Sequence, residues 1–285
     1  MTPAASPDDT APILFHVEHP AATITLNRPA RGNALTPELQ NEFLSYLDRA
    51  SKDNLIHYVI LQAKGKYFCT GMDLSTTGSS LAGGNEQLYI AGRSFFEALE
   101  SFPKPLIAIA HGNVYGGGCG IFFSADIRLA SSAATFQLTE VTRGLVPALI
   151  SPTIIREWGP QLARDAMLTA RPISAKELYS RHIVSCVFDS AQDGESQLVQ
   201  ITQMLKRGGP KALQRSKALV RTQAQPGLSL LSPHDTAAGQ AEKTVKDAFL
   251  EMMAPSEEAM HGILAFRQSK GNRYVDWLNF YKSKL

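Results

Sequence analysis

The stretch "HGNVYGGGCGIFFSAD", residues 111–126, carries three successive glycines, Gly116 to Gly118, between an apolar segment and an apolar run. We expect a strand that turns through these glycines into a helix. The first N–H groups of a helix lack internal partners and attract negative charge. Because glycine has no Cβ, a ligand could approach this backbone closely. The glycines are equally compatible with a tight turn that has no further role.

A second stretch, "FCTGMD", residues 68–73, has a similar order of apolar residues, small residues and glycine. If the N–H groups of Met72 and Gly117 converged on one oxygen, they would form an oxyanion hole able to stabilise a thioester enolate. Taken alone, either stretch is explained as well by a tight turn.

Other glycine-rich sites do not fit the sequence. A dinucleotide motif G-x-G-x-x-G that started at Gly116 would require a third glycine where Ile121 stands. The sequence has no Gly-Lys-Ser or Gly-Lys-Thr for a P-loop. It also lacks the G-x-S-x-G motif of a serine hydrolase elbow.

Composition narrows the class of protein. The 285 residues are 44% hydrophobic and 19% charged, which is typical of a soluble globular protein. A net charge of +2 argues against nucleic acid as the main partner, and no apolar run approaches the roughly 20 residues of a membrane span. The three cysteines lack metal-ligand spacing, so we expect neither a metal site nor a disulfide framework.

The pattern along the chain predicts an α/β fold. A hairpin is expected over residues 13–26, followed by a helix that Thr36 caps and Pro37 begins. Alternating strands and helices up to about residue 190 favour parallel strands with crossover helices. The remainder reads as helical. The expected later elements are strands in 57–65, 104–112, 127–131 and 134–138, and helices over 87–102, after Gly118, in 197–209 and in 256–269.

Five motifs together resemble the crotonase, or enoyl-CoA hydratase/isomerase, superfamily in their order and spacing, over about residues 13–190. They are "ITLNRPARGNALT", "FCTGMDL", "KPLIAIAHGNVYGGGCG", "ADIRLAS" and "TFQLTEVTRGLVPAL". The resemblance implies a crotonase spiral of repeated ββα units with a C-terminal helical trimerisation region. The domains would then be a flexible N-terminus over 1–12, a spiral core over 13–195 and a helical region over 196–285.

The resemblance also implies an acyl-CoA substrate, assembly as a homotrimer or homohexamer, and neither a metal nor a cofactor beyond the CoA of the substrate. It implies that the backbone N–H groups of Met72 and Gly117 form the oxyanion hole. Residues 28–35 would lie along CoA, and Phe266 would lie near an adenine pocket shared between subunits. The implied substrate- and CoA-binding residues are Arg28, Asn33, Ala34, Leu35, Thr70, Gly71, Gly116 and Phe266.

Typical hydratases of this family carry two glutamates, and the first of them would fall at Gly120. The second falls at Glu140, where the apolar neighbours Leu138 and Val141 favour a raised pKa and a role as general base. The alternative is a surface pair of Glu140 with Arg143. Asp73 is a second catalytic candidate, with a structural role in its loop as the alternative.

Three functions remain open from the sequence. The first is an enoyl-CoA hydratase or dehydratase. Residues 68–73 together with residues 139–175 resemble dehydratases of 3-hydroxy-3-methylglutaryl thioesters, which suggests a branched 3-hydroxyacyl-CoA such as mevalonyl-CoA, in siderophore, toxin or fatty-acid metabolism. The second is a 3,2-enoyl-CoA isomerase that uses one glutamate. The third is a non-catalytic CoA- or RNA-binding relative.

The tripeptide Ser283-Lys284-Leu285 matches the address read by the peroxisomal import receptor. A basic helix end with no targeting role is the alternative. The first residues, "MTPAASPDDTAPILF", lack the basic and apolar regions of a secretory signal. We therefore expect a peroxisomal protein.

Overall fold

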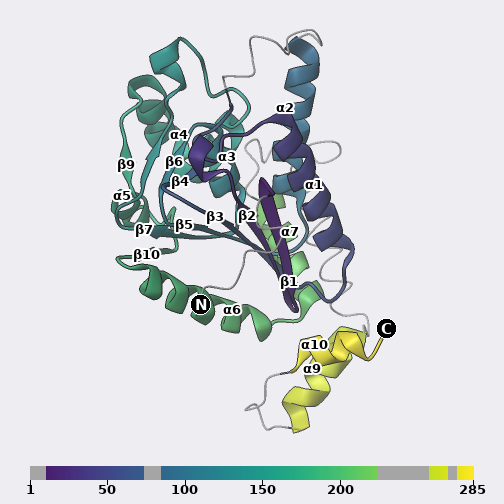
Figure 1. Ribbon diagram of the computed structural model, residues 1–285. Coiled ribbons are helices and arrows are strands. Elements are labelled where there is room, and N and C mark those ends of the chain that lie inside the picture. Colours follow the sequence, from purple (N-terminus) through teal and green to yellow (C-terminus); the bar gives the residue numbers. More distant parts are fainter. Residues whose placement is uncertain (1–10, 74–84, 224–256, 269–274) are drawn as a thin grey trace, which may run out of the picture. The chain divides into compact units, whose positions relative to one another are not determined.

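The computed structural model describes residues 11–73, 85–223, 257–268 and 275–285 (Figure 1). The chain divides into two compact units. One comprises residues 1–102 with 106–198, and the other comprises residues 103–105 with 199–285. Most of residues 1–12 and all of residues 74–84, 224–256 and 269–274 lie outside the described residues.

The first unit contains a six-stranded sheet in the order β1-β2-β3-β5-β7-β10 (Figure 1). Strands β1 and β2 pair antiparallel, which confirms the predicted hairpin. From β2 to β10 every neighbouring pair is parallel, as the alternation of strands and helices predicted. The strands are β1 (Ile13–Glu18), β2 (Ala21–Leu26), β3 (Tyr58–Ala63), β5 (Leu106–Ala110), β7 (Ile127–Ser131) and β10 (Cys186–Phe188).

A smaller second sheet has the order β4-β6-β8-β9. Its strands are β4 (Tyr67–Cys69), β6 (Asn113–Tyr115), β8 (Thr135–Gln137) and β9 (Ile173–Ser174). The chain therefore passes from a strand of the large sheet to one of the small sheet and then toward a helix. It repeats this ββα turn through β3–β4, β5–β6 and β7–β8.

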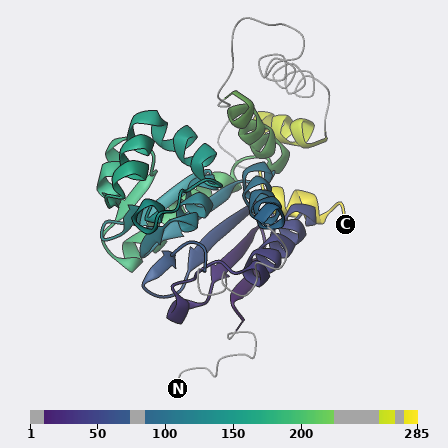
Figure 2. The ribbon, with the colours of Figure 1, turned by 90° about the horizontal axis from the view of Figure 1, so that it is seen from above.

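Helices complete each turn of the spiral. Helix α1 (Pro37–Lys52) begins as predicted, with the Thr36 side chain accepting a hydrogen bond from the Leu39 amide. The apolar face of α1 buries Leu39, Phe43 and Leu47 because these residues recur at helical spacing. Helix α2 (Asn85–Ser101) packs beside α1, and Figure 2 shows these purple and blue helices next to each other. Helices α3 (Gly117–Ser124) and α4 (Ser151–Thr169) follow.

The end of the first unit contains α5 (Ala175–Ser180), and α6 (Ala191–Lys206) continues into the second unit. The second unit contains α7 (Pro210–Gln223), α9 (Glu257–Gln268) and α10 (Trp277–Lys282). In this unit the Glu258 carboxylate accepts hydrogen bonds from the Lys211 and Ala212 amides at the start of α7. The Tyr281 hydroxyl also donates to Glu258, which ties α10 to α9. No described helix has the length and apolar character needed to cross a bilayer.

Candidate active site

The backbone from Thr70 to Asp73 leaves one amide available. Thr70 N donates to Gly32 O at 3.0 Å, and Asp73 N donates to Leu35 O at 3.0 Å. Gly71 N donates to Cys69 Sγ at 3.4 Å. Among the described residues the Met72 amide has no acceptor, although Met72 forms a parallel bridge with Leu35. The pairing of this segment with residues 32–35 therefore fixes a free N–H at Met72.

The start of α3 supplies a second free amide beside the first. Gly116 caps the helix with φ +51°, a conformation that favours glycine. Its amide donates to Gln137 O at 2.9 Å, whereas the Gly117 amide has no acceptor in the described part of the chain. A Cβ on Gly117 would lie 3.8 Å from Met72 N, and one on Gly71 would lie 2.9 Å from Gly117 N. Two unused donors thus lie side by side.

Glu140 lies against the same helix start. It begins the short 3₁₀ helix η4 (Glu140–Arg143), which follows strand β8. A Cβ on Gly116 would lie 3.0 Å from Glu140 Oε1, so the absence of a side chain at Gly116 makes room for the carboxylate. Glu140 Oε2 is buried and has no hydrogen-bond partner among the described residues. A buried carboxylate oxygen without a partner is poised to accept a proton from a bound molecule.

Burial raises the pKa of the Glu140 carboxyl, and a backbone hydrogen bond and the positive charge of Arg143 offset part of this effect. The alternative surface pair with Arg143 does not form, because Arg143 Nη1 instead donates to Thr139 O at 3.1 Å. The negative charge of Glu140 also raises the pKa of the buried Cys119 thiol, although burial is the larger cause. Glu140 is therefore a poorly solvated carboxylate with the electrostatics of a general base.

The position of the missing glutamate is filled by hydrocarbon. Gly120 is buried in α3, and its carbonyl accepts a hydrogen bond from Ser124 Oγ at 2.7 Å. A Cβ on Gly120 would lie 2.4 Å from Ile150 Cγ2 and 2.5 Å from Phe96 Cε1. The space toward which a side chain at position 120 would extend is therefore occupied by two apolar groups.

Asp73 is buried and pairs with Arg28, whose Nη2 lies 3.5 Å from Asp73 Oδ2. Arg28 Nη1 also donates to Ala34 O at 2.7 Å. The guanidinium of Arg28 therefore links the segment that contains Ala34 to the segment that contains Met72 and Asp73. Asn33, with φ +54°, accepts from Arg28 N and donates to Lys64 O and Tyr67 O. These contacts hold in place the backbone on which the Met72 segment packs.

The remaining predicted binding residues fall into two places. Ala34, Leu35, Thr70 and Gly71 all lie on the two paired segments around Met72, and Leu35 N donates to Gly71 O at 2.8 Å. Phe266 lies on α9, in the second unit, and its side chain is outside the described residues. The structure thus brings all the predicted residues of the first unit to one region.

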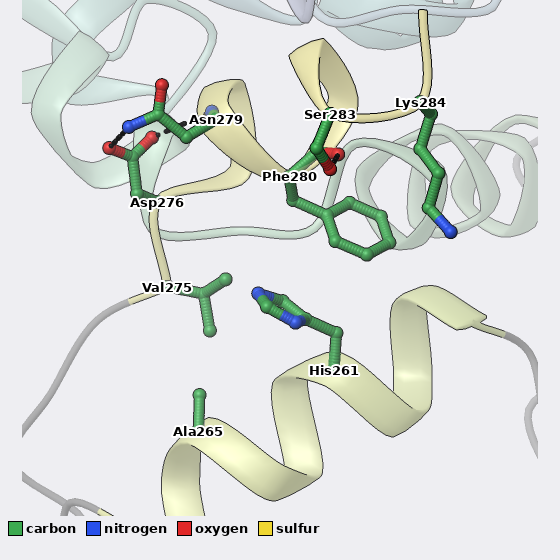
Figure 3. A pocket seen from close by; sticks show the side chains of 8 residues that line it. All are labelled: His261, Ala265, Val275, Asp276, Asn279, Phe280, Ser283 and Lys284. Carbon is green, nitrogen blue, oxygen red and sulfur yellow. Dashed lines mark hydrogen bonds between the residues drawn. The ribbon is translucent and has the colours of Figure 1, made fainter.

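A separate pocket of about 630 Å³ lies in the second unit (Figure 3). The ring of His261 stacks on that of Phe280 at a centroid distance of 4.6 Å, and Lys284 Nζ lies 5.5 Å from the Phe280 centroid. The residues lining it are His261, Ala265, Val275, Asp276, Asn279, Phe280, Ser283 and Lys284. The described residues contain no group of three or more His, Cys, Asp or Glu side chains that could hold a metal ion.

Sequence reasoning missed Phe96, Ile150 and Cys69 as parts of this region. Phe96 and Ile150 read as ordinary core residues because their distance to Gly120 depends on how α2 and α4 pack. The only local signal was Gly120 itself, a glycine inside an apolar helix. Cys69 gave no signal beyond its place before Thr70 and Gly71.

Comparison with known proteins agrees with this geometry. Residues 17–255 match the profile of the family described as enoyl-CoA hydratase/isomerase. The chain is 37% identical over 257 residues to the enoyl-CoA hydratase AKT6-1 of Alternaria alternata, covering 89% of this chain and 80% of that protein. It is 32% identical to the probable enoyl-CoA hydratase EchA14 of Mycobacterium tuberculosis H37Rv, over 79% of this chain and 88% of that one.

Among solved structures, Pseudomonas aeruginosa AtuE aligns with a TM-score of 0.82 and 28% identity, covering 94% of this chain and all of that chain (100%). The ββα spiral, the paired amides and the buried glutamate are thus accompanied by similarity over most of the length. The chain belongs to the enoyl-CoA hydratase/isomerase family, within the crotonase superfamily.

Proposed function

We propose that this protein is an enoyl-CoA hydratase or dehydratase in which Glu140 is the general acid–base. The observation that carries the proposal is the buried, unpartnered Glu140 Oε2 next to the helix start that presents the free Gly117 amide. The amides of Met72 and Gly117 would bind the thioester oxygen. The names of the similar enzymes support water addition or loss as the reaction.

In the dehydration direction, Glu140 removes the proton at Cα of a 3-hydroxyacyl-CoA, and the electron pair moves into the thioester as an enolate. The two amides stabilise the oxygen of this enolate. The enolate then expels the hydroxyl at Cβ, which takes the proton from Glu140 and leaves as water. The products are a 2-enoyl-CoA and water, and Glu140 returns to its ionised form.

A second candidate, a 3,2-enoyl-CoA isomerase, is favoured by the environment of Gly120. Because Phe96 and Ile150 occupy that side, no second carboxylate of the described residues stands there to handle a hydroxyl. Isomerisation needs only one base, which takes a proton from C2 and returns it to C4. Glu140 and the same two amides would suffice.

The test is to incubate the protein separately with a 2-enoyl-CoA, a 3-enoyl-CoA and 3-hydroxyacyl-CoA thioesters in ¹⁸O-labelled water. A hydratase incorporates the label at Cβ, whereas an isomerase converts the 3-enoyl-CoA to the 2-enoyl-CoA without it. Glu140→Gln should lower kcat by about 10²–10⁴-fold. Glu42→Gln, which alters an acidic residue of α1, is the matched control and should stay active.

A wild-type protein that bound acyl-CoA but turned over no thioester would instead support the non-catalytic relative. The mevalonyl-CoA assignment and the siderophore, toxin or fatty-acid setting rest on the sequence resemblance alone.

For peroxisomal location we propose Ser283-Lys284-Leu285 as the signal, and these residues are exposed. Fluorescence microscopy of a fusion with and without this tripeptide checks the proposal, and identical cytosolic signals would contradict it.

A further inference from the structure

The side of α3 that carries Gly120 is closed by two apolar side chains from neighbouring elements. Phe96 comes from α2, and Ile150 immediately precedes α4. Only 7% of Phe96 and 3% of Ile150 remain exposed. Both side chains come within 2.5 Å of the point where a Cβ of residue 120 would lie. They can therefore pack directly on the backbone of α3 because residue 120 is glycine.

This apolar wall lies one helical turn from the proposed oxyanion hole. Gly120 follows Gly117 by three residues in α3, and residues three apart on a helix are neighbours at about 5–6 Å. Gly116, at the start of the same helix, lies against Glu140. A thioester held between Gly117 and Glu140 would therefore have the wall within a few carbon atoms of its carbonyl group.

Hydrogen bonds between polar side chains join α2 to α4 next to this apolar wall. Glu100 lies one turn after Phe96 on α2, and Thr153 lies three residues after Ile150 on α4. The Thr153 hydroxyl donates to Glu100 Oε1, and Arg156 Nη2 lies 3.1 Å from the same oxygen. The wall is therefore fixed by contacts on both sides and has little freedom to move aside for a ligand.

We infer that Phe96 and Ile150 determine the acyl specificity of this enzyme, and this inference rests on the proposed function. They form the surface against which the acyl chain beyond Cβ packs. An aromatic ring and a branched aliphatic side chain offer no partner to a hydroxyl or carboxylate, so burying such a group there is unfavourable. The substrate class is then an acyl-CoA with a hydrocarbon chain, in preference to a mevalonyl or carboxylate-terminated group.

The experiment compares wild type, Phe96→Ala and the matched control Phe95→Ala. Phe95 is the adjacent buried residue of α2, and its ring contacts those of Phe43 and Phe96, so its loss removes a buried ring of the same size without opening the space beside Gly120. The substrates are short linear, long linear, methyl-branched and carboxylate-terminated 2-enoyl-CoAs, with mevalonyl-CoA as the 3-hydroxyacyl probe. Wild type should prefer the hydrocarbon chains. Phe96→Ala should raise kcat/KM for long or branched chains relative to the short one by about tenfold, whereas Phe95→Ala should leave that ratio unchanged.

A packing measurement tests the wall without relying on turnover. Gly120→Ala should lower Tm by about 3–10 °C in wild type and in the Phe95→Ala background, because the added methyl group overlaps the wall. In the Phe96→Ala background it should cost clearly less. Equal losses in all three backgrounds would overturn the role of Phe96 as the group that fills this space.

Two outcomes separate this inference from the proposed function. A Phe96→Ala variant that turned over every thioester with the same proportional change would overturn acyl selection while leaving the function intact. Failure of wild type to turn over any thioester would contradict the function. The acyl preference would then be measured as the affinity for the same CoA thioesters by calorimetry. An identical ranking of affinities in wild type and Phe96→Ala would overturn acyl selection by Phe96.

Discussion

At the scale of single residues, Glu140 combines burial with a missing partner, and this has a consequence for stability. Because its pKa in the folded chain is raised above the ordinary value of 4.5, the folded state holds the proton more tightly than the unfolded state. Folding therefore loses stability as the pH rises from about the unfolded pKa through the folded pKa. The ionised carboxylate destabilises the fold at neutral pH.

Glu140→Gln removes this titration while keeping the shape of the side chain. We expect its Tm to exceed that of wild type by a few degrees at neutral pH, with the difference shrinking as the pH falls through the raised pKa toward 4.5. Calorimetry of both proteins between pH 4 and pH 8 checks this. A variant less stable than wild type at pH 8, or a difference independent of pH, would contradict an unpaired buried carboxylate.

The residues of the site differ in how visible they are in the sequence. Glu140, Met72 and Gly117 were predictable because motifs place them at fixed positions along the chain, and the structure brings them to one helix start. The contacts of Phe96 and Ile150 with Gly120 were not predictable, since they join residues 24 and 30 positions apart through the packing of helices. Sequence motifs therefore predict the backbone turns of the site, whereas they do not predict which side chains of different helices contact one another.

At the scale of elements, the start of α3 allows the oxyanion donor to be removed with little change of shape. Gly117 is the first residue of the helix, a position that tolerates proline, and proline lacks an N–H. We expect Gly117→Pro to lower kcat by about 10²–10³-fold.

Gly117→Ala is the control for the added side-chain atoms. Its Cβ would lie 3.4 Å from Leu35 Cδ1 and 3.5 Å from Gly71 Cα, which are ordinary contacts, and it keeps the amide. Circular dichroism and steady-state kinetics on both variants check the prediction. If the folded proline variant kept wild-type kcat, the Gly117 amide would not be part of an oxyanion hole.

The elements themselves were predicted unevenly. Helix α1 was recognisable because a capping threonine, a proline and apolar residues at helical spacing all agree. The two-residue strand β9 was missed because so short a segment has no period of its own. Helix α4 was missed because Gly159 and Pro160 interrupt it, and Gly159 has φ +74° inside the element. The separation of the strands into two sheets depends on their pairing, which short strands do not specify locally.

At the scale of the whole molecule, the resemblance to crotonases predicts a homotrimer or homohexamer. Several apolar side chains of the first unit are exposed around the segment that follows Glu140, and an assembly would be expected to cover such groups. They include Val141 at 40%, Leu145 at 46% and Val146 at 74% exposure. Exposed apolar side chains that gather in one segment are common at surfaces that contact another protein chain.

Light scattering coupled to size-exclusion chromatography should therefore give about three or six times the chain mass of 31.0 kDa. If residues 141–146 contribute to the contact, Val146→Glu should shift the distribution toward smaller species, because a charge buried at an apolar interface is unfavourable. Thr142→Glu, at an exposed polar position in the same segment, is the control and should disturb assembly less. A wild-type mass equal to one chain at micromolar concentration would contradict the predicted assembly, and trimers unaffected by Val146→Glu would place the contact on another surface.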